Sequence, residues 1–483
     1  MTKLPYSRVI WLSCFMLFGC AHIPGNKTVS KPVSSVKLEK TSVAYRRLEG
    51  RTSWPITDWW KAFGDRRLNQ VEAKALSTNP TLAETAARIR LADARVREIS
   101  ASVEPNISLD GTVNRQHLSQ NGLVPPPFSG STVNFGDLAA NYKQDFDFWG
   151  LNKARIAVAR SNLNAAYANE AEARILIAIS VANTWFKLGE VGQDLRLQRD
   201  LLQVNQSQLQ IDKDLEKAGL ESNLPVLSDN AEREQLINEL RHLQALNEAG
   251  HYQLAALAGE SPDAANRYTS IKLPQYAAFL GVPPRLPIDL LSRRADIVTL
   301  RNRIEASNFE IKSARAEFYP DINLSAMIGF QSINLGSLIE APNLAASIGP
   351  AFHLPIFEGG ALRANLSARR AQYDENVAQY NQAVLNAAKQ VAQALSSIHS
   401  QSSRLKHAKF RLMDMDRVLN LVKQRYQSGI VAFTTELQAK ENQILARRVV
   451  NSLYMKNLMA QLDLIKALGG GYKMPTENSV GAE

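Results

Sequence analysis

The 483-residue chain has only two cysteines, Cys14 and Cys20, and both lie in its first twenty residues. This leaves no thiol pair for a disulfide framework and no thiolate metal site in the rest of the chain. The seven histidines show no metal-ligand spacing, and neither a G-x-S-x-G motif nor a phosphate loop is present. These absences predict that the protein is not an enzyme and has no cofactor.

Aromatic residues make up only 7% of the chain and charged residues 21%. The formal net charge is +10, but the basic residues are spread along the chain among acidic ones instead of clustering with aromatics. A nucleic-acid-binding protein concentrates its basic residues in one patch, so this distribution predicts no nucleic-acid partner.

Proline and glycine are scarce in two long stretches. No proline lies between Gly150 and Gly219, and neither proline nor a further glycine lies between Gly360 and Gly429. Such runs predict helices on the order of 100 Å long at 1.5 Å per residue. A shorter helix is predicted after each break, so each half contains a long helical hairpin.

Heptad spacing continues up to both breaks, which predicts coiled-coil packing as far as the hairpin turns. The residues are Leu197, Leu201, Val204, Gln208, Ile211 and Leu215 before the first break, and Leu405, Ala408, Leu412, Met415, Leu419, Val422 and Tyr426 before the second.

The N-terminus has the features of an export signal. Lys3 and Arg8 precede a short apolar stretch that ends in LFGC at Cys20. This box resembles a bacterial lipoprotein cleavage site, so we expect a covalent lipid such as palmitate on Cys20. Ala21 follows the cysteine, where an inner-membrane retention signal usually has Asp, which favours the outer membrane.

The two halves of the chain repeat one plan. EPNISL at Glu104–Leu109 matches YPDINL at Tyr319–Leu324 with an offset of 215 residues. From Gly150 onward the offset is 210, and it pairs Gly150 with Gly360 and Gly219 with Gly429. One length change between positions 109 and 150 explains both offsets, so we infer a tandem duplication.

Four segments alternate apolar and polar residues with the period of a β-strand. The apolar sets are Ile107, Leu109, Gly111 and Val113; Leu138, Ala140, Tyr142, Phe146 and Phe148; Ile322, Leu324, Ala326, Ile328 and Phe330; and Leu344, Ala346, Ile348, Phe352, Leu354 and Ile356. Asp145 and Asp147 fall on the polar face of the second set. Four strands cannot close a barrel in lipid, so either two or three chains must pool their strands, unless the sheet is soluble.

The resulting domain plan has six parts. Residues 1–19 are the signal peptide, 20–56 a lipidated linker, 271–290 a linker between repeats and 472–483 a tail. Repeat 1 spans 57–270, with a β-hairpin at 104–149 and a helical tip at 218–224. Repeat 2 spans 291–471, with a β-hairpin at 320–357 and a helical tip at 428–433.

Motifs along the whole chain resemble the TolC family of outer-membrane efflux proteins, in particular its NodT-like lipoprotein branch. They are WWKAFGD at Trp59–Asp65, DFWGLNK at Asp147–Lys153, LPIDLLSRRADI at Leu286–Ile297, AEFYPDINL at Ala316–Leu324, LPIFEGGALRANL at Leu354–Leu366, RYQSG at Arg425–Gly429 and KALGGGY at Lys466–Tyr472.

The resemblance implies an α+β membrane protein that forms a homotrimer in the outer membrane. Three chains would contribute four strands each to a twelve-stranded β-barrel, continuous with a periplasmic α-helical barrel. The hairpin turns would contact a periplasmic adaptor through Gly219, Leu220, Gly429 and Ile430. An inner-membrane pump, of the RND type in preference to the ABC or MFS type, would supply small molecules for passive exit.

Two residues depart from the family pattern at the tips. Pro225 and Gln438 stand where the family often has aspartate, which removes two candidates for an acidic ring. We therefore predict a periplasmic gate formed by Tyr426, Gln427, Thr434 and Gln438. The alternatives are an exit duct for type I protein secretion and a periplasmic coiled-coil lipoprotein without a pore.

Overall fold

The structure is a computed structural model that describes Gly25 and residues 27–33, 54–268, 271, 273–274 and 293–473. The chain divides into two compact units. Unit 1 comprises residues 1–32, 88–166 and 300–380, and unit 2 comprises 33–87, 167–299 and 381–483. The predicted signal peptide, Cys20 and most of the two predicted linkers and the tail lie outside the described residues.

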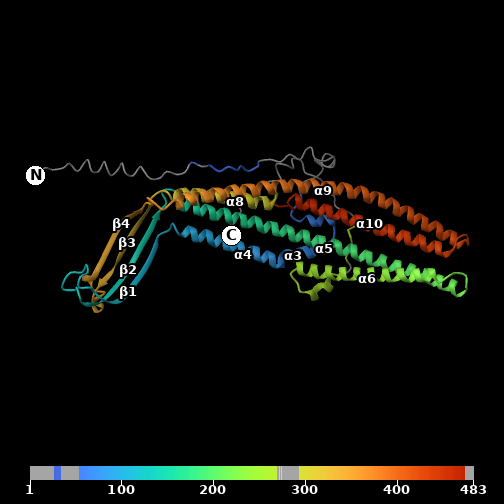
Figure 1. The fold of residues 1–483 in the computed structure, drawn as a ribbon, viewed down its shortest axis with the longest axis horizontal. Coiled ribbons are helices and arrows are strands. Elements are labelled where there is room, and N and C mark those ends of the chain that lie inside the picture. Colours follow the sequence, from blue (N-terminus) through green and yellow to red (C-terminus); the bar gives the residue numbers. More distant parts are fainter. Residues whose placement is uncertain are drawn as a thin grey trace. The chain divides into compact units, whose positions relative to one another are not determined.

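Unit 1 contains one antiparallel sheet of four strands (Figure 1). The strands are β1 (Asn106–His117), β2 (Thr132–Phe146), β3 (Asp321–Ser332) and β4 (Leu344–His353), in the order β1-β2-β3-β4. Each repeat supplies one hairpin, and β2 of the first pairs with β3 of the second. The four strands predicted from the period-two alternation are therefore present.

The strand register brings the apolar residues of all four strands onto one face. Leu109 pairs with Ala140, Ala140 with Ile328, and Ile328 with Ala346. Ile107 and Ile348, on the same face, are 73% and 77% exposed in the single chain. The sheet therefore carries an apolar face that is largely exposed in the single chain, with Leu335 and Leu338 lying over it at Gly136.

Two strand predictions extend too far. We expected Leu354 and Ile356 to continue the last strand, but β4 ends at His353 because its partner β3 begins at Asp321, opposite His353. Asp147 was expected on the polar face of the second strand, but β2 ends at Phe146. The Asp147 carboxylate instead accepts hydrogen bonds from the backbone N–H groups of Asn152 (3.1 Å) and Lys153 (2.7 Å). It thereby satisfies free donors in the first turn of the next helix.

The helices repeat with the same period as the sequence. Helix α4 (Pro80–Ala101) precedes β1, and α8 (Ala295–Ala316) precedes β3. The long helices α5 (Leu151–Lys217) and α9 (Ala361–Gln427) both contain 67 residues. They are followed by α6 (Leu224–Leu257) and α10 (Phe433–Ala467). Each repeat thus has the predicted order of helix, two strands, long helix and returning helix.

Shorter elements complete the described part of the chain. They are the helix α3 (Arg66–Thr78) and the 3₁₀ turns η1 (Trp59–Phe63), η2 (Pro262–Arg267), η3 (Leu335–Ser337) and η4 (Ala341–Asn343).

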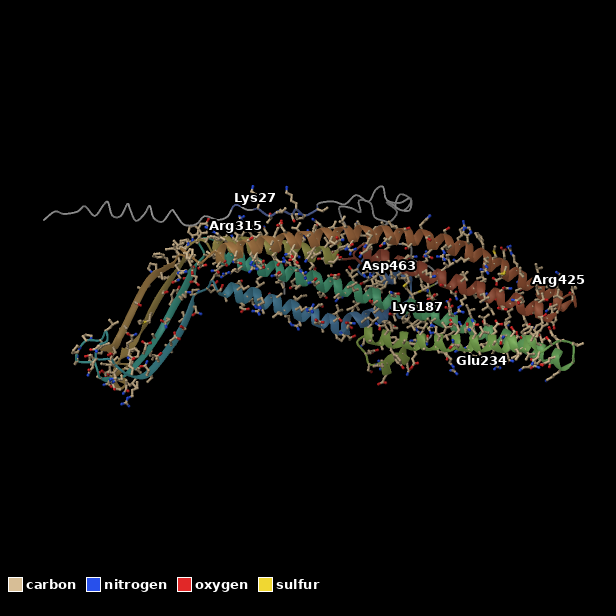
Figure 2. The ribbon with its side chains drawn as sticks, in the orientation of Figure 1. Lys27, Lys187, Glu234, Arg315, Arg425 and Asp463 are labelled. Carbon is tan, nitrogen blue, oxygen red and sulfur yellow. The ribbon has the colours of Figure 1, made fainter. Side chains whose placement is uncertain are left out.

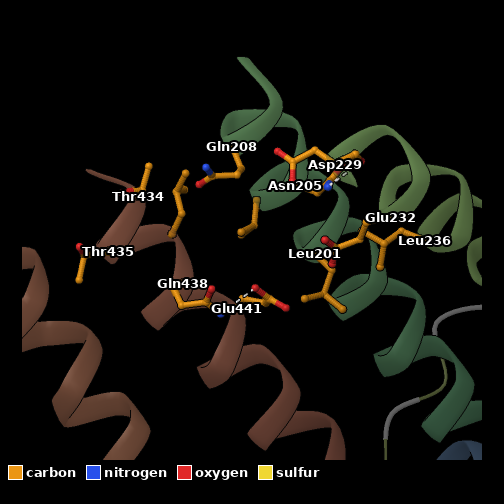
Figure 3. Close-up of a pocket in the computed structure, with 12 residues that line it drawn as sticks. Leu201, Asn205, Gln208, Asp229, Glu232, Leu236, Thr434, Thr435, Gln438 and Glu441 are labelled. Carbon is orange, nitrogen blue, oxygen red and sulfur yellow. Dashed lines mark hydrogen bonds between the residues drawn. The ribbon is translucent and has the colours of Figure 1, made fainter. Parts of the chain in front are cut away.

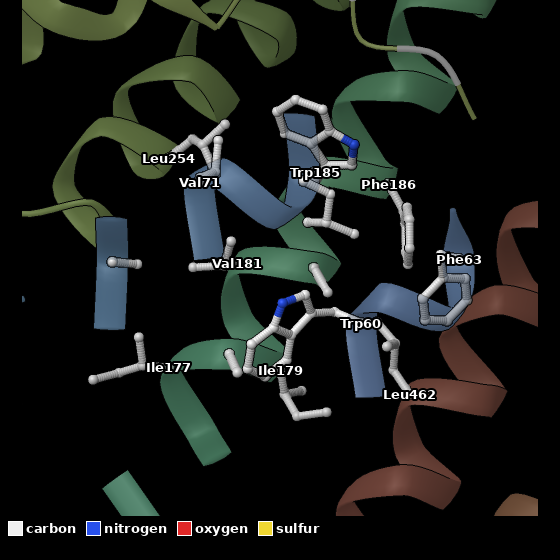
Figure 4. Close-up of a cluster of buried hydrophobic side chains, with 14 of the residues drawn as sticks. Trp60, Phe63, Val71, Ile177, Ile179, Val181, Trp185, Phe186, Leu254 and Leu462 are labelled. Carbon is white, nitrogen blue, oxygen red and sulfur yellow. The ribbon is translucent and has the colours of Figure 1, made fainter. Parts of the chain in front are cut away.

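The main apolar core lies in unit 2 and gathers aromatic residues from the WWKAFGD motif (Figure 4). Trp60 and Phe63 of η1 are buried with Trp185 and Phe186 of α5, and the Phe63 and Phe186 rings lie 4.9 Å apart. Trp185 donates a hydrogen bond from Nε1 to Asp65 Oδ2 (2.9 Å). The motif therefore has a packing role, because a buried indole N–H needs an acceptor.

The heptad residues lie where the spacing placed them. Leu197, Leu201 and Val204 of α5 are buried and pack with Leu437 and Ile444 of α10. The first seam thus contacts the second hairpin as well as its own. On α9, the predicted seam is the less exposed side, whereas Phe410 and Leu421 on its other faces are at least half exposed.

One described helix, α5, is long and apolar enough to cross a membrane. Its most apolar 18-residue segment is 56% buried within the chain, and polar residues occupy its other faces. Both features are typical of a helix in a protein core.

Candidate gate and docking site at the hairpin tips

The two hairpin tips have the same backbone geometry. Gly219 and Gly429 both adopt the left-handed conformation, with φ of +68° and +71°. The N–H of Leu220 bonds to the Leu215 carbonyl (3.0 Å), and the N–H of Ile430 bonds to the Arg425 carbonyl (2.9 Å). This six-to-one bond after a left-handed glycine is a Schellman motif, which satisfies the last carbonyls of each long helix.

The tips present apolar side chains to solvent. Leu220 is 75% exposed and Ile430 is 62% exposed. A Cβ on Gly219 or Gly429 would meet no atom within 4 Å, so glycine is required there for its backbone conformation and not for space. Both tips are therefore free in the single chain to contact a partner.

The returning helices begin differently at the two tips. Pro225 lies in the first turn of α6, where its missing N–H costs no helical bond. Phe433 begins α10, and its ring lies 5.1 Å from that of Tyr426 at the end of α9. This ring contact joins α9 to α10 at the second tip within one chain. The heptad spacing did not predict a contact made by Phe433.

A groove of about 500 Å³ lies next to the tips, between α5, α6 and α10 (Figure 3). We call it the tip groove. It is lined by Leu201, Val204, Asn205, Gln208, Asp229, Glu232, Leu236, Thr434, Thr435, Leu437, Gln438 and Glu441.

The predicted gate residues separate into two groups. Thr434 and Gln438 line the tip groove, and Gln438 donates a hydrogen bond from Nε2 to Glu441 (3.0 Å). Tyr426 and Gln427 end α9 outside that lining, and Tyr426 contacts Phe433 instead. Within the described part of one chain no hydrogen bond joins Gln438 to Tyr426 or Gln427, so a bonded gate between chains stays a prediction.

The tip groove contains carboxylates that the sequence did not single out. Asp229 and Glu232 of α6 and Glu441 of α10 line it without a basic residue. Burial and a hydrogen bond to Asp212 of α5 raise the pKa of Asp229 to about 6. Burial, with the charge of Glu232, also raises the pKa of Glu441. Pro225 and Gln438 thus lack the aspartate that the family often has at their positions, but Asp229 and Glu441 place carboxylates about one turn further along the same helices.

Neutral acceptors and donors surround these carboxyl groups. Gln208, the polar residue in the first seam, donates from Nε2 to Asp212 Oδ1 (3.0 Å). Asn205 is buried and donates from Nδ2 to the Asp229 carbonyl (3.2 Å). Asp212 and Asp229 flank apolar heptad positions, which usually indicates a solvated face, so no signal in the sequence would have located them here.

Polar pairs tie the helices together away from the groove. Gln443 of α10 donates from Nε2 to Asp416 of α9 (2.7 Å), and Arg448 of α10 forms an ion pair with Glu239 of α6 (2.6 Å). Arg425 near the second tip and Glu234 on α6 are exposed on the surface (Figure 2). Within the described residues, no group of three or more His, Cys, Asp or Glu side chains could hold a metal ion.

Known proteins resemble this chain in sequence and in fold. The family described as outer membrane efflux protein matches residues 72–259 and 286–470, which together include most of both repeats. The chain belongs to the outer membrane efflux protein family. The efflux role and the outer-membrane location predicted from the sequence are therefore confirmed.

Relatives of this outer membrane efflux protein match it over nearly their whole length. The multidrug resistance outer membrane protein MdtP of Escherichia coli K12 is 28% identical over 473 residues, which cover 95% of each chain. The crystal structure of the outer membrane protein VceC from Vibrio cholerae is 32% identical and has a TM-score of 0.77. It matches 87% of this chain and 100% of its own.

A third match shows the fold alone. The CmeC outer membrane channel of Campylobacter jejuni is 21% identical but has a TM-score of 0.83, covering 95% of this chain and 97% of its own. The predicted TolC-like fold, with four strands per chain and long helical hairpins, is therefore confirmed for this outer membrane efflux protein.

Proposed function

We propose that this protein is the passive outer-membrane exit duct of a tripartite efflux system and that three copies form the channel. The observation that carries the proposal is the four-stranded sheet with an exposed apolar face. Among the strands of the described residues, β1 and β4 each have a neighbour on one side only. An open strand edge in lipid leaves backbone groups unpaired, so the sheet must be closed by further copies.

Three copies would place twelve strands in one barrel, which lies in the size range of bacterial outer-membrane barrels. The helices α5 and α9 would each extend on the order of 100 Å from it into the periplasm. The exposed apolar residues of α9 support packing between neighbouring copies, because a surface helix face of this kind is usually covered in an assembly.

The tips are the proposed contact for a periplasmic adaptor. Leu220 and Ile430 are exposed next to Gly219 and Gly429, and both tips present the same turn. Such a paired apolar surface suits a helical-hairpin partner. We assign the gate to Tyr426, Gln427, Thr434 and Gln438, and an RND-type pump of the inner membrane would supply the energy.

Small toxic molecules are the proposed cargo. The relatives MdtP and MdtQ are named multidrug resistance outer membrane proteins. We further propose that Cys20 carries the lipid of the mature N-terminus, because the LFGC box precedes it directly.

The test is reconstitution of the purified protein into planar bilayers, together with deletion of the gene and a panel of toxic compounds. We expect trimers that resist dissociation until heated, discrete single-channel conductance, and greater sensitivity of the deletion strain to several drugs. A protein that is monomeric and gives no conductance would contradict the channel. Pull-down of an adaptor, lost in the Leu220→Asp/Ile430→Asp double variant, tests the docking surface.

A further inference from the structure

The described residues near the N-terminus, which we call the strap (Lys27–Val33), lie against helix α9. Asp374 accepts hydrogen bonds from the backbone N–H groups of Val29 (3.1 Å to Oδ1) and Ser30 (2.8 Å to Oδ1). Oδ2 of the same carboxylate also accepts from Val29 (3.2 Å). Asn381 Oδ1 accepts from the N–H of Val33 (2.8 Å).

These contacts hold the strap by its backbone, since its side chains are mostly exposed. Val29 itself is 88% exposed, so apolar burial contributes little to its position. A carboxylate that accepts from two successive N–H groups forms charge-assisted bonds, which are stronger than neutral ones. Asp374 is therefore the main attachment of the strap on α9.

The two attachment points give the strap a direction. Val29 and Ser30 lie at Asp374, and Val33 lies at Asn381, so the strap runs parallel to α9. Four extended residues span about 13 Å, and seven helical residues rise about 10 Å, so the spacings agree. The N-terminal side of the strap consequently points toward Ala361, where α9 begins after the sheet.

The length of chain before the strap matches the distance to the sheet. Asp374 lies thirteen residues into α9, about 20 Å from its start. Cys20 lies nine positions before Val29, and this stretch can span at most about 30 Å. A lipid on Cys20 can therefore reach the level of the sheet while Asp374 still holds Val29.

The first repeat has no equivalent of this attachment. With the offset of 210 residues, Asn164 stands at the position of Asp374 and Ala171 at that of Asn381. The first repeat thus has a neutral amide where the second has the carboxylate, and no acceptor side chain at Ala171. This difference is expected if the pair in the second repeat serves the single N-terminus and not the shared helical packing.

We propose that Asp374 and Asn381 form a receptor on α9 that holds the strap and directs the lipid-bearing N-terminus to the membrane beside the sheet. Asp374 is a positioning residue in this role. The directing part rests on the proposed lipid at Cys20, whereas the holding part does not.

Limited trypsin digestion of the purified full-length protein tests the holding part. Lys27 is the cleavable basic residue of the strap, because Pro32 follows Lys31 and blocks cleavage there. We expect Asp374→Ala to accelerate cleavage after Lys27 at least fivefold, Asp374→Asn less, and Asn381→Ala by an intermediate factor. Cleavage of Asp374→Ala at the wild-type rate overturns the proposal.

Glu375→Ala is the matched control. Glu375 is an exposed acid next to Asp374 that, within the described ranges, accepts hydrogen bonds only from Gln372 and Gln379 on its own helix. We expect the cleavage rate of Glu375→Ala to equal that of wild type. Equal acceleration in Asp374→Ala and Glu375→Ala would mean that either change loosens the helix, and it would also overturn the proposal. The unlipidated Cys20→Ala protein should stay protected at Lys27.

A spin label on Gly25→Cys in liposome-embedded protein tests the directing part. Its accessibility to oxygen relative to a water-soluble nickel chelate reports depth. We expect Asp374→Ala to lower that ratio at least twofold in lipidated protein, and Glu375→Ala to leave it unchanged. An unchanged ratio in Asp374→Ala would mean that the receptor does not direct the lipid. These readouts need no efflux, so they separate this proposal from the proposed function.

Discussion

Asp229 of α6 and Asp212 of α5 share a hydrogen bond across the first hairpin, and burial together with this bond raises the pKa of Asp229 to about 6. Its ordinary value is 3.8, so the folded state holds this proton more tightly than the unfolded state. The resulting stability is fully present below about pH 4 and is lost as the pH rises through about 6. Burial and the charge of Glu232 also raise the pKa of Glu441, another acid of the tip groove, so its protonation acts in the same direction.

We therefore predict that the first hairpin tip opens more readily above pH 6. Hydrogen exchange of residues 218–232, corrected for intrinsic rates, should be faster at pH 7.5 than at pH 5. Asp229→Asn keeps a hydrogen-bonding side chain without the charge and should remove this difference. Glu234→Gln, which alters an exposed acid of the same helix, should keep it. A pH dependence that persists in Asp229→Asn would assign it to other groups.

Glu72 of α3, in unit 2, gives a second pH effect. Its side chain is fully buried, neither carboxyl oxygen has a hydrogen-bond partner among the residues that the structure describes, and burial raises its pKa to about 9. Stability should fall as the pH rises from about 4.5 to 9, and the cost at pH 7 is about 3 kcal/mol per chain. Glu72→Gln should raise the melting temperature at pH 8 and flatten its pH profile. An unchanged profile would show that Glu72 gains a partner in the assembly.

The tip glycines give a test of backbone conformation. Gly429→Ala places a Cβ in the left-handed region and should cost about 1–2 kcal/mol at the tip. Gly429→Asn should cost less, because asparagine tolerates that region. Gly192→Ala, in the interior of α5 with equally open space, should instead be neutral or stabilising. Protease cleavage at residues 425–433 in each variant measures the effect, and equal resistance of Gly429→Ala and Gly192→Ala would refute it.

The sheet faces give a test of the barrel. Leu109→Arg places a charge on the apolar face and should cost about 2–4 kcal/mol near the bilayer centre. We expect few heat-resistant trimers of this variant in the outer membrane. Asn141→Arg, on the opposite face, should assemble normally and shift the ion selectivity toward anions. Normal assembly of Leu109→Arg would mean that this face does not contact lipid.

The gate assignment gives a test by conductance. Tyr426→Ala removes the ring contact with Phe433, and Gln438→Ala removes the bond to Glu441. The combined variant should conduct several times more current than wild type and should raise drug sensitivity through leakage. Gln372→Ala, a surface change on α9 far along the helix, is the control. No change in either measurement would show that the gate lies elsewhere.

Much of this architecture could be predicted because it depends on local periodicity. The 210-residue offset placed Gly219 and Gly429 at equivalent breaks, and α5 and α9 each end two residues before them. Alternation in the four strands assigned Leu109, Ala140 and Ile328 to one face, and the register confirms it. These signals survive in the sequence because side chains repeat with the period of the backbone.

Other features depend on contacts between distant segments and have no periodic signature. The end of β4 at His353 follows from where β3 begins, and the cap made by Asp147 follows from where α5 begins. The sequence by itself thus determined the repeat, the hairpins, the apolar face and the family. Only the tertiary structure decided that Asp229 interacts with Asp212, that Asp229 and Glu441 line one groove beside the tips, and that Asp374 holds the strap. Such pairings arise when separate helices pack, because the partner that desolvates or bonds a polar group is chosen by the fold and not by its neighbours in sequence.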